Sequence, residues 1–256
     1  MALFEVDRLT VRFGGVTALE DFSFAVGSGE IVGLIGPNGA GKTTLFNVIT
    51  GFEPPSAGRL RFQGEDITGW PPHRIALAGI VRTYQKTSVF PQLSVLENLR
   101  IGRHRRTAAG LADALLRTAR HRREASETSA RAMEILGFLG LEAERERRAA
   151  GLPYGLLRKL ELAIALMSEP TLLCLDEPAA GLNPTETNAL GQAIVRIRET
   201  GVTIVLVEHN MDLVMNLCER VAVLHFGRKI AEGPPAAVQA NPEVVRVYLG
   251  EVVPVA

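Results

Sequence analysis

The residues best suited to chemistry form a glycine-rich segment near the N-terminus, Gly36-Pro37-Asn38-Gly39-Ala40-Gly41-Lys42-Thr43. This segment matches the pattern G-x-x-x-x-G-K-[ST] at every fixed position. Glycines let backbone amides turn inward toward an anion, and a helix starting near Lys42 adds the positive end of its dipole. Lys42 is expected to reach β- and γ-phosphates, and the Thr43 hydroxyl to bind Mg²⁺. The segment predicts a nucleoside triphosphate site; the alternative is a glycine-rich turn that binds nothing.

The residues on either side of this segment have the order strand, loop and helix that the motif requires. An apolar run from Ile31 to Ile35 precedes the loop and predicts a strand. Thr44 and the apolar residues up to Ile49 follow it and predict a helix. We therefore include Thr44 with the loop among the expected nucleotide-binding residues.

A second apolar strand, which ends in two acids, supplies the carboxylates of the predicted site. Residues 172–175 are all apolar, as in a strand buried on both faces, and Asp176 and Glu177 follow. Asp176 is expected to hold Mg²⁺ directly or through water, and Glu177 to orient or deprotonate the attacking water. The alternative for this acidic pair is an ordinary loop start.

Two more polar side chains follow predicted strands. His209 comes after the strand at 202–207, and such positions in a parallel sheet face the ligand crevice. A neutral imidazole there would hydrogen-bond the γ-phosphate, whereas a loop histidine without a role is the alternative. Gln85 follows a strand-like stretch at 81–84, and its amide is suited to sensing Mg²⁺ or the attacking water. Taken by itself, Gln85 would be unremarkable.

The elements that must position these residues alternate between strands and helices. Strands are expected around the loop at 4–13, 22–26 and 58–62. From residue 94 to 167 the chain is rich in Ala, Leu, Arg and Glu, which predicts helices, with a capping box at Ser94 to Glu97 and a long helix from about 108 to 139. The later elements are a helix at 183–200 ended by Gly201, a strand at 202–207, a hairpin of strands at 221–225 and 228–232, and short helices begun by Pro234 and Pro242. This order predicts an α/β fold with a helical insertion.

The composition excludes several classes of protein. The formal net charge is +0, which gives no global attraction to nucleic acid or to an anionic membrane. The N-terminus does not resemble a signal peptide, and no apolar stretch approaches the roughly 18 residues of a transmembrane helix. A membrane role is therefore expected to come through a partner. Cys174 and Cys218 lie in apolar stretches, which favours buried thiols and a reducing compartment.

Basic residues gather in three short runs within the predicted helical insertion. Solvated helix faces are one interpretation, and contact with lipid headgroups or a partner is the other. Aromatic residues are not interleaved with these runs, which argues against nucleic-acid binding. The runs are at 103–106, 120–123 and 145–148.

The order of the motifs resembles that of the ATP-binding subunits of ABC transporters over essentially the whole chain. Residues 36–43 resemble the family's Walker A motif, 172–176 its Walker B motif and 178–183 its D-loop. By this resemblance Glu177 is the catalytic glutamate and His209 the switch histidine.

Two further residues gain an expected role from the resemblance. Gln85 corresponds to the Q-loop glutamine, which acts in catalysis and contacts Mg²⁺. Phe13 stands where the family keeps an aromatic residue that stacks on adenine, and a core strand residue is the alternative. ATP and Mg²⁺ are the implied cofactors.

The resemblance also implies the fold and its division. It is a single ABC ATPase domain over 1–256, with a P-loop NTPase core, an antiparallel β subdomain and an inserted α-helical subdomain. Residues 1–87 and 167–233 are expected to form the nucleotide-binding α/β core. Residues 88–166 are expected to form the helical insertion that carries the signature motif, and 234–256 the short C-terminal helices.

Within the family, the chain is most similar to the importers of branched-chain amino acids, the LivG type. The absence of a long C-terminal regulatory domain agrees with this subgroup. The stretches that carry the similarity are Arg12 to Gly15, Leu152 to Gly155, Ala179 to Pro184, Glu208 to Met211 and Tyr248 to Glu251.

The signature motif departs from the family's common Leu-Ser-Gly-Gly-Gln and reads Leu152-Pro153-Tyr154-Gly155-Leu156. Pro153 has neither a hydroxyl nor an N–H group to offer the γ-phosphate of ATP held by an opposing subunit. Tyr154 and Gly155 are still expected to contact that nucleotide, because backbone N–H groups and the helix dipole remain. Leu156 offers apolar surface for packing against a partner.

The resemblance implies an ATPase that powers import, with two such domains closing head to tail on two ATP molecules. Its expected place is the cytoplasmic face of a bacterial-type plasma membrane, as a peripheral subunit. The expected partners are two permease subunits, a second ATP-binding subunit (a copy or a LivF-like relative) and, indirectly, a solute-binding protein, with no nucleic acid.

Three alternatives remain at this point. One is a regulatory subunit that binds nucleotide and hydrolyses little, which Pro153 and Leu156 motivate. Another is an ABC ATPase that works on nucleic acid or ribosomes, against which the neutral charge argues. The third is an importer of urea or amides, because the permease and the solute-binding protein select the cargo.

Overall fold

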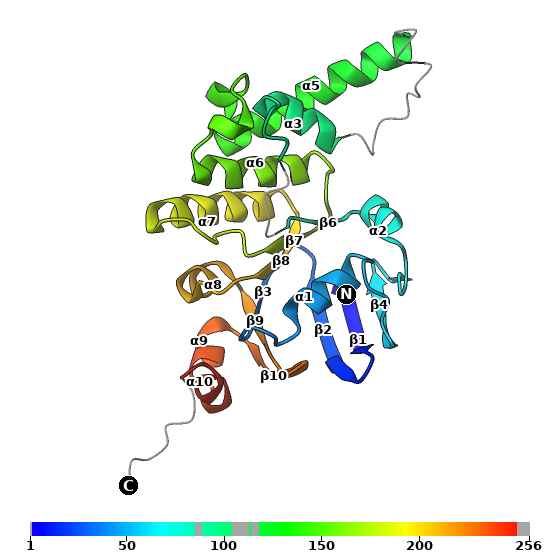
Figure 1. Cartoon of the computed structure of the whole chain (residues 1–256), viewed down its shortest axis with the longest axis vertical. Helices are drawn as coiled ribbons and strands as arrows, with labels where there is room; N and C mark the ends of the chain where they lie inside the picture. The colour runs from blue at the N-terminus through cyan, green and yellow to red at the C-terminus, as the bar shows by residue number, and fades with distance from the viewer. Residues whose placement is uncertain (1, 85–88, 104–112, 114–117, 250–256) are drawn as a thin grey trace. The chain divides into compact units, whose positions relative to one another are not determined.

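The computed structural model describes residues 2–84, 89–103, 113 and 118–249 (Figure 1). The chain divides into two compact units. Unit 1 comprises Met1–Arg82, Thr171–Glu177 and Ile194–Ala256, and unit 2 comprises Thr83–Pro170 and Pro178–Ala193. Residues 178–193 thus group with the helical part of the chain, although they follow a core strand in the sequence.

The larger sheet of unit 1 has six strands in the order β10-β9-β3-β8-β7-β6. Neighbouring strands from β9 to β6 are parallel, and β10 pairs antiparallel with β9. All residues of β3, β7 and β8 are buried, which confirms the burial predicted for residues 172–175. The strands are β3 (Ile31–Ile35), β6 (Ile80–Arg82), β7 (Leu172–Asp176), β8 (Thr203–Val207), β9 (Arg220–His225) and β10 (Arg228–Gly233).

The smaller sheet of unit 1 is antiparallel, in the order β2-β1-β4-β5. Phe4 is opposite Val26 on one side and Phe62 on the other, and all three side chains are buried. The expected strands are confirmed, and the first two are longer than predicted. The strands are β1 (Ala2–Phe13), β2 (Val16–Gly27), β4 (Ala57–Phe62) and β5 (Glu65–Asp66).

The core of unit 1 contains side chains of both sheets and of helix α1 (Lys42–Ile49). Leu45, Phe46 and Ile49 of this helix are fully buried in that cluster. The helix that follows the glycine-rich segment is therefore anchored by apolar contacts on its inner face, which holds the preceding loop in place. The other helices described in unit 1 are α2 (Pro72–Ala78), the last part of α7 (Pro184–Glu199), α8 (Met211–Leu217), α9 (Pro235–Gln239) and α10 (Pro242–Leu249).

Turn chemistry near the C-terminus agrees with the sequence prediction. β9 and β10 form the expected hairpin, whose turn residues Phe226 and Gly227 have φ values of 44° and 77°. Pro234 caps α9, and Pro242 begins α10. Each proline stands at a helix start, where its missing N–H group costs no hydrogen bond.

Unit 2 is built from helices and short 3₁₀ turns (Figure 1). The predicted capping box begins α3: Glu97 N donates to Ser94 Oγ at 3.2 Å, and Ser94 N donates to Glu97 Oε2 at 2.8 Å. The elements are α3 (Val95–Gly102), α5 (Ala119–Leu139), the 3₁₀ turns η2 (Glu142–Glu144) and η3 (Ala149–Gly151), α6 (Tyr154–Leu166) and the first part of α7 (Pro184–Glu199).

The predicted long helix ends at Leu139, as expected, and Gly140 adopts the left-handed conformation after it. Its predicted start near residue 108 lies outside the described residues. In the described part, α5 begins after Thr118, whose hydroxyl accepts the N–H group of His121. The helix predicted over 183–200 is confirmed as α7, and Gly201 follows it with a φ of 95°.

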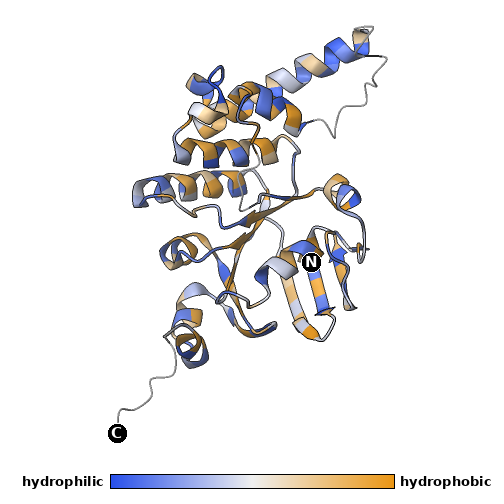
Figure 2. Cartoon of the chain, viewed as in Figure 1, coloured by the Kyte–Doolittle hydropathy of each residue, from blue (hydrophilic) through white to orange (hydrophobic). Residues whose placement is uncertain are grey.

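Charged residues on α5 pair with one another along the helix. Arg120 contacts Glu124, and Arg123 contacts Glu127, at i,i+4 spacing. Figure 2 shows this helix with hydrophilic and hydrophobic residues mixed along its length. The pairing supports the interpretation of the run at 120–123 as a solvated helix face. Across the residues that the structure describes, none of the helices is long and apolar enough to cross a membrane.

Both cysteines are buried and unpaired with each other, as predicted. Burial raises the pKa of Cys174 and of Cys218 to about 12. Both are therefore neutral thiols that belong to the apolar core of the protein rather than nucleophiles.

Candidate nucleotide-binding site

The phosphate loop, residues 36–43, joins β3 to α1 in unit 1. Gly36 and Gly41 have φ values of 154° and 107°. A Cβ atom on Gly36 would lie 2.2 Å from the Leu224 carbonyl oxygen, and one on Gly41 would lie 2.7 Å from that of Ala18. Both positions therefore require glycine, for the backbone angle and for the close approach of a neighbouring strand.

Lys42 is held along this loop rather than extended into solvent. It is 6% exposed, and its Nζ donates to Gly36 O at 2.6 Å and to Pro37 O at 3.0 Å. Burial lowers the pKa of Lys42, and the nearby negative charges of Glu177 and Asp176 oppose this change. The ammonium group thus bonds the loop carbonyls within electrostatic reach of two carboxylates, and it can transfer its hydrogen bonds to a phosphate.

Asp176 ends β7 with its carboxylate buried in an ion pair. Arg82, the last residue of β6, donates from Nη2 to Asp176 Oδ2 at 2.6 Å. Sequence reasoning did not select Arg82. The available signal was a charged residue at the end of a short apolar stretch, Ile80-Val81, which pairs in parallel with the strand that carries Asp176.

Glu177 and His209 meet although 32 positions separate them in the sequence. His209 Nε2 lies 3.0 Å from Glu177 Oε1. Glu177 follows β7, and its N–H group donates to Val207 O at the end of β8 at 2.8 Å. The parallel register of β7 and β8 thus brings the two predicted catalytic side chains to the same sheet edge.

Glu208, which sequence reasoning did not assign, organises the backbone beside His209. Its carboxylate is buried and accepts the N–H groups of His209 at 3.0 Å and of Asn210 at 3.2 Å. Asn210 in turn caps α8 by accepting the N–H group of Leu213. The turn that presents the imidazole is therefore fixed by a buried carboxylate and a helix cap.

The donor atoms at this site suit Mg²⁺. Thr43 places a hydroxyl in the first turn of α1. Asp176 and Glu177 lie close enough to Lys42 for their negative charges to act on its pKa. Oxygen donors are the ligands of Mg²⁺, which is usually held by one or two carboxylates together with substrate phosphates. No group of three or more His, Cys, Asp or Glu side chains that could hold a metal by themselves occurs among the residues described.

Two further predicted site residues are Phe13 and Gln85. Phe13 ends β1 beside Val16 and is 46% exposed, so its ring is not a core side chain and is open to stacking. The alternative of a buried strand residue is therefore wrong for Phe13. Gln85 lies outside the described residues.

The C-terminal helix α10 contacts the phosphate loop through Tyr248. Burial raises the pKa of Tyr248 to about 12, and a hydrogen bond with the backbone of Gly36 opposes this change. Tyr248 belongs to one of the stretches that carry the similarity to the importers of branched-chain amino acids. Its contact with Gly36 joins that stretch to the phosphate loop within unit 1.

In unit 2, the residues of the signature motif lie at the N-terminus of α6. Pro153 is the N-cap, without a side-chain hydrogen bond. Arg158 Nη2 donates to the Tyr154 hydroxyl at 2.5 Å and to Ala180 O at 3.4 Å. A Cβ atom on Gly155 would lie 2.7 Å from Glu186 Oε1. The signature residues are thus packed against 178–186 within the same unit.

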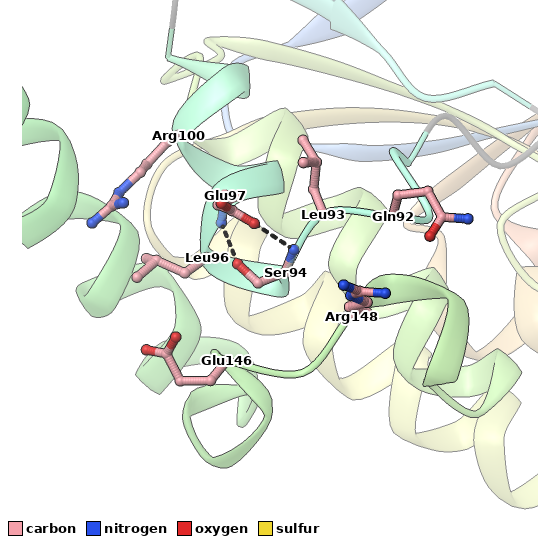
Figure 3. A pocket seen from close by; sticks show the side chains of 8 residues that line it. All are labelled: Gln92, Leu93, Ser94, Leu96, Glu97, Arg100, Glu146 and Arg148. Carbon is pink, nitrogen blue, oxygen red and sulfur yellow. Dashed lines mark hydrogen bonds between the residues drawn. The ribbon is translucent and has the colours of Figure 1, made fainter.

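Unit 2 also has a polar pocket of about 450 Å³ beside the capping box of α3 (Figure 3). The side chains of Glu97 and Ser94 there are already engaged with each other's backbone. The pocket contains none of the predicted nucleotide-binding residues. It is lined by Gln92, Leu93, Ser94, Leu96, Glu97, Arg100, Glu146 and Arg148.

Comparison with protein families identifies two regions of the chain. A model described as ABC transporter matches residues 19–180. A second, described as branched-chain amino acid ATP-binding cassette transporter, matches residues 228–254. The first match includes the phosphate loop, Asp176 and Glu177, and the second includes β10 and the C-terminal helices.

Several curated proteins are similar over nearly the full length. BraF of Pseudomonas aeruginosa, a high-affinity branched-chain amino acid transport ATP-binding protein, is 42% identical over 97% of this chain and 98% of its own. LivG of Escherichia coli K12, which has the same description, is 43% identical with the same coverage.

Solved structures of ATP-binding cassettes share the fold. A nucleotide-free cassette from an ABC transporter has a TM-score of 0.86 and 34% identity, and covers 98% of this chain and 100% of its own. A cassette in its ADP conformation has the same TM-score and coverage with 33% identity. These matches and the geometry of the phosphate loop show that the chain belongs to the ABC transporter family, among its ATP-binding proteins.

Proposed function

We propose that this chain is the ATP-binding and ATP-hydrolysing subunit of an ABC importer for branched-chain amino acids. Relatives described as branched-chain amino acid transport ATP-binding proteins, at 42% and 43% identity, support the cargo class. The observation that carries hydrolysis is the meeting of Glu177 with His209 at 3.0 Å, at the sheet edge that also bears Asp176.

ATP binding is the task of the phosphate loop. Its backbone N–H groups and the N-terminus of α1 provide a positive field for the phosphates. Lys42 exchanges its bonds to Gly36 O and Pro37 O for bonds to the β- and γ-phosphates. Phe13 offers an exposed ring for the adenine.

Hydrolysis needs a water aligned with the γ-phosphate and a group that accepts its proton. Glu177 serves as that base, and the His209 imidazole holds its carboxylate and contacts the γ-phosphate. Thr43, Asp176 and Gln85 would hold Mg²⁺, which would supply positive charge against the phosphates when bound. Glu208 keeps His209 in place through the backbone bonds described above.

Transport follows from coupling hydrolysis to the closure of two subunits. Two chains of this type close head to tail on two ATP molecules, and Tyr154 and Gly155 of one contact the nucleotide of the other. Hydrolysis removes the γ-phosphate contacts and opens the pair, which moves the attached permease.

The proposed assembly contains two permease subunits and a second ATP-binding subunit, which is either a copy of this chain or a LivF-like relative. A solute-binding protein delivers the cargo to the permease. The proposed place of the chain is the cytoplasmic face of the membrane, where it binds these permeases as a peripheral subunit.

The experiment that tests this function uses the complete complex in membrane vesicles with ATP inside or outside. When Mg·ATP is present on the side of the membrane that bears this chain, labelled leucine is expected to accumulate on that same side. Excess isoleucine or valine is expected to reduce this accumulation by competing with leucine for transport. Accumulation of urea or a short amide, with no competition by leucine, would contradict the proposed cargo.

A second candidate is a regulatory subunit that binds nucleotide with little hydrolysis. It is favoured by Pro153, which caps α6 without a side-chain hydrogen bond and has no hydroxyl for an opposing phosphate. Steady-state phosphate release by the complex with its permease separates the two functions. A rate of phosphate release that rises when cargo is transported supports the ATPase. A rate that stays near zero even with the permease and cargo present supports the regulatory subunit.

A further inference from the structure

Arg82 places a guanidinium group on the carboxylate that is proposed to hold Mg²⁺. Besides its bond to Asp176, it donates from Nη1 to Asn47 Oδ1 in α1 at 2.7 Å. Its carbon Cζ also lies 5.3 Å from the centre of the Phe46 ring. One side chain therefore joins β6, β7 and α1, the last two of which bear the proposed metal ligands Asp176 and Thr43.

This ion pair is shielded from water. The Arg82 and Asp176 side chains are 5% and 9% exposed. Removing one member of a buried pair leaves the other charge uncompensated, which is far costlier than losing a surface pair. A planar guanidinium can bond Asp176 and Asn47 at once, whereas an ammonium group is a single point charge. The geometry thus fits a counter-ion that is in place on Asp176 before nucleotide binds.

The balance of charge around Asp176 shows what such a counter-ion does. Lys42 and Arg82 carry two positive charges, and Asp176 and Glu177 carry two negative charges. A divalent cation arriving without nucleotide meets these four side chains with a summed formal charge of zero, one unit more positive than it would be without Arg82. The phosphates of ATP bring negative charge with them, so a cation arriving with nucleotide meets a favourable field.

We propose that Arg82 is a positioning residue that neutralises and orients the Asp176 carboxylate until nucleotide arrives, and so makes divalent-cation binding depend on nucleotide. This inference rests on the proposed function of the site and adds a control on its metal affinity. It assigns Arg82 a role in the order of binding, apart from the proton transfer at Glu177.

The test is Mn²⁺ binding to the full chain, measured by electron paramagnetic resonance with and without ADP. Arg82→Met removes the charge and keeps an unbranched side chain. We expect Mn²⁺ without nucleotide to bind about tenfold more tightly to this variant, because one unit of repulsion is gone. The gain in affinity that ADP provides shrinks correspondingly. Unchanged or weaker Mn²⁺ binding by the folded variant would overturn the proposal.

Matched variants separate charge from structure. Arg82→Lys keeps the charge and is expected to stay within about twofold of the parent chain. In the double variant Arg82→Met with Asp176→Asn, the gain in Mn²⁺ affinity is expected to disappear. Tighter Mn²⁺ binding that persists in the double variant would contradict the proposal. If Arg82→Met does not fold, Arg82→Gln removes the charge while retaining a donor for Asn47, and the same tightening is required.

These measurements need no permease. Failure of the import assignment would appear as absent transport by the complete complex, whereas failure of the Arg82 proposal would appear in the Mn²⁺ titration of the isolated chain.

Discussion

Glu177 combines an unusual backbone with a polar contact. Its φ is 48°, in the left-handed region that non-glycine residues occupy at a cost of about 1–3 kcal/mol. Its N–H group is fixed to Val207 O, and its carboxylate meets His209. Strain at such a position persists where surrounding structure determines it, here the paired ends of β7 and β8. The left-handed backbone at Glu177 interrupts the extended conformation of β7, and the carboxylate contacts the His209 imidazole.

Glu177→Gln keeps the shape of this side chain and removes the base. We expect ATP affinity to stay within about threefold and turnover to fall by about 10²- to 10⁴-fold, the usual contribution of a general base. Binding of a fluorescent ATP analogue and phosphate release measure the two quantities. Glu243→Gln, at an exposed site on α10, is the control. Near-normal turnover in Glu177→Gln would remove Glu177 from its proposed role.

For Lys42 the expected effect is on ATP affinity, because its positive charge contacts the bound phosphates. In Lys42→Ala the phosphates lose charge-assisted hydrogen bonds worth about 1.5–3 kcal/mol, which corresponds to about 10- to 100-fold weaker ATP binding. Isothermal titration with Mg·ATP checks this value, and a thermal melt without nucleotide confirms that the variant is folded. An unchanged affinity would contradict the assignment of residues 36–43 as a phosphate loop.

At the scale of elements, the phosphate loop is shaped by its neighbours as much as by its own residues. Gly227 N donates to Ala40 O at 2.9 Å, so the β9–β10 turn supports the loop. Leu224 and Ala18 approach the loop so closely that a side chain at Gly36 or Gly41 would collide with backbone. The motif therefore needs β2 and β9 beside it to hold its conformation.

A pair of substitutions separates backbone strain from steric collision in this loop. Gly41→Ala adds a Cβ atom at φ 107° and 2.7 Å from the Ala18 carbonyl oxygen, whereas Gly64→Ala adds one at φ 82° in open space. We expect Gly64→Ala to lower the free energy of unfolding by about 1–2 kcal/mol from strain. Gly41→Ala is expected to cost more and to weaken ATP binding.

Denaturant unfolding and ATP titration of both variants provide the measurements. Equal stability losses in the two variants, with ATP binding retained in Gly41→Ala, would show that the approach of β2 does not shape the loop.

At the scale of the whole molecule, unit 1 buries residues that are distant in sequence in one apolar core, and unit 2 presents the signature residues on a separate helical scaffold. Cys174 and Cys218 test the burial of unit 1, because both are buried there and burial raises their pKa values to about 12. A thiol of that pKa is almost wholly protonated at neutral pH and thus a poor nucleophile.

We therefore expect both thiols to resist Ellman's reagent in the folded protein and to react within minutes in guanidinium chloride. Because both pKa values lie well above neutral, raising the pH from 7 to 9 should leave the folded protein unreactive. Rapid modification of either cysteine under native conditions would contradict the burial of β7 or of the end of α8.

Local sequence was sufficient to predict features whose cause is local. The phosphate loop, the capping box at Ser94, the buried strands and the proline-begun helices all depend on residues within a few positions of one another. Turn geometry, capping and the periodicity of apolar residues act over that range. The same reasoning located Asp176, Glu177 and His209 at strand ends.

Tertiary structure decided what depends on the order of strands. Arg82 meets Asp176 because β6 pairs with β7, and Glu177 meets His209 because β7 pairs with β8. Glu208 acts through its buried carboxylate, which accepts the N–H groups of His209 and Asn210 in the folded turn after β8. Phe13 is exposed because it ends its strand, although its sequence context equally suited a core position. Such contacts join residues far apart in the chain, and periodicity within one segment carries no information about which strand will lie beside it.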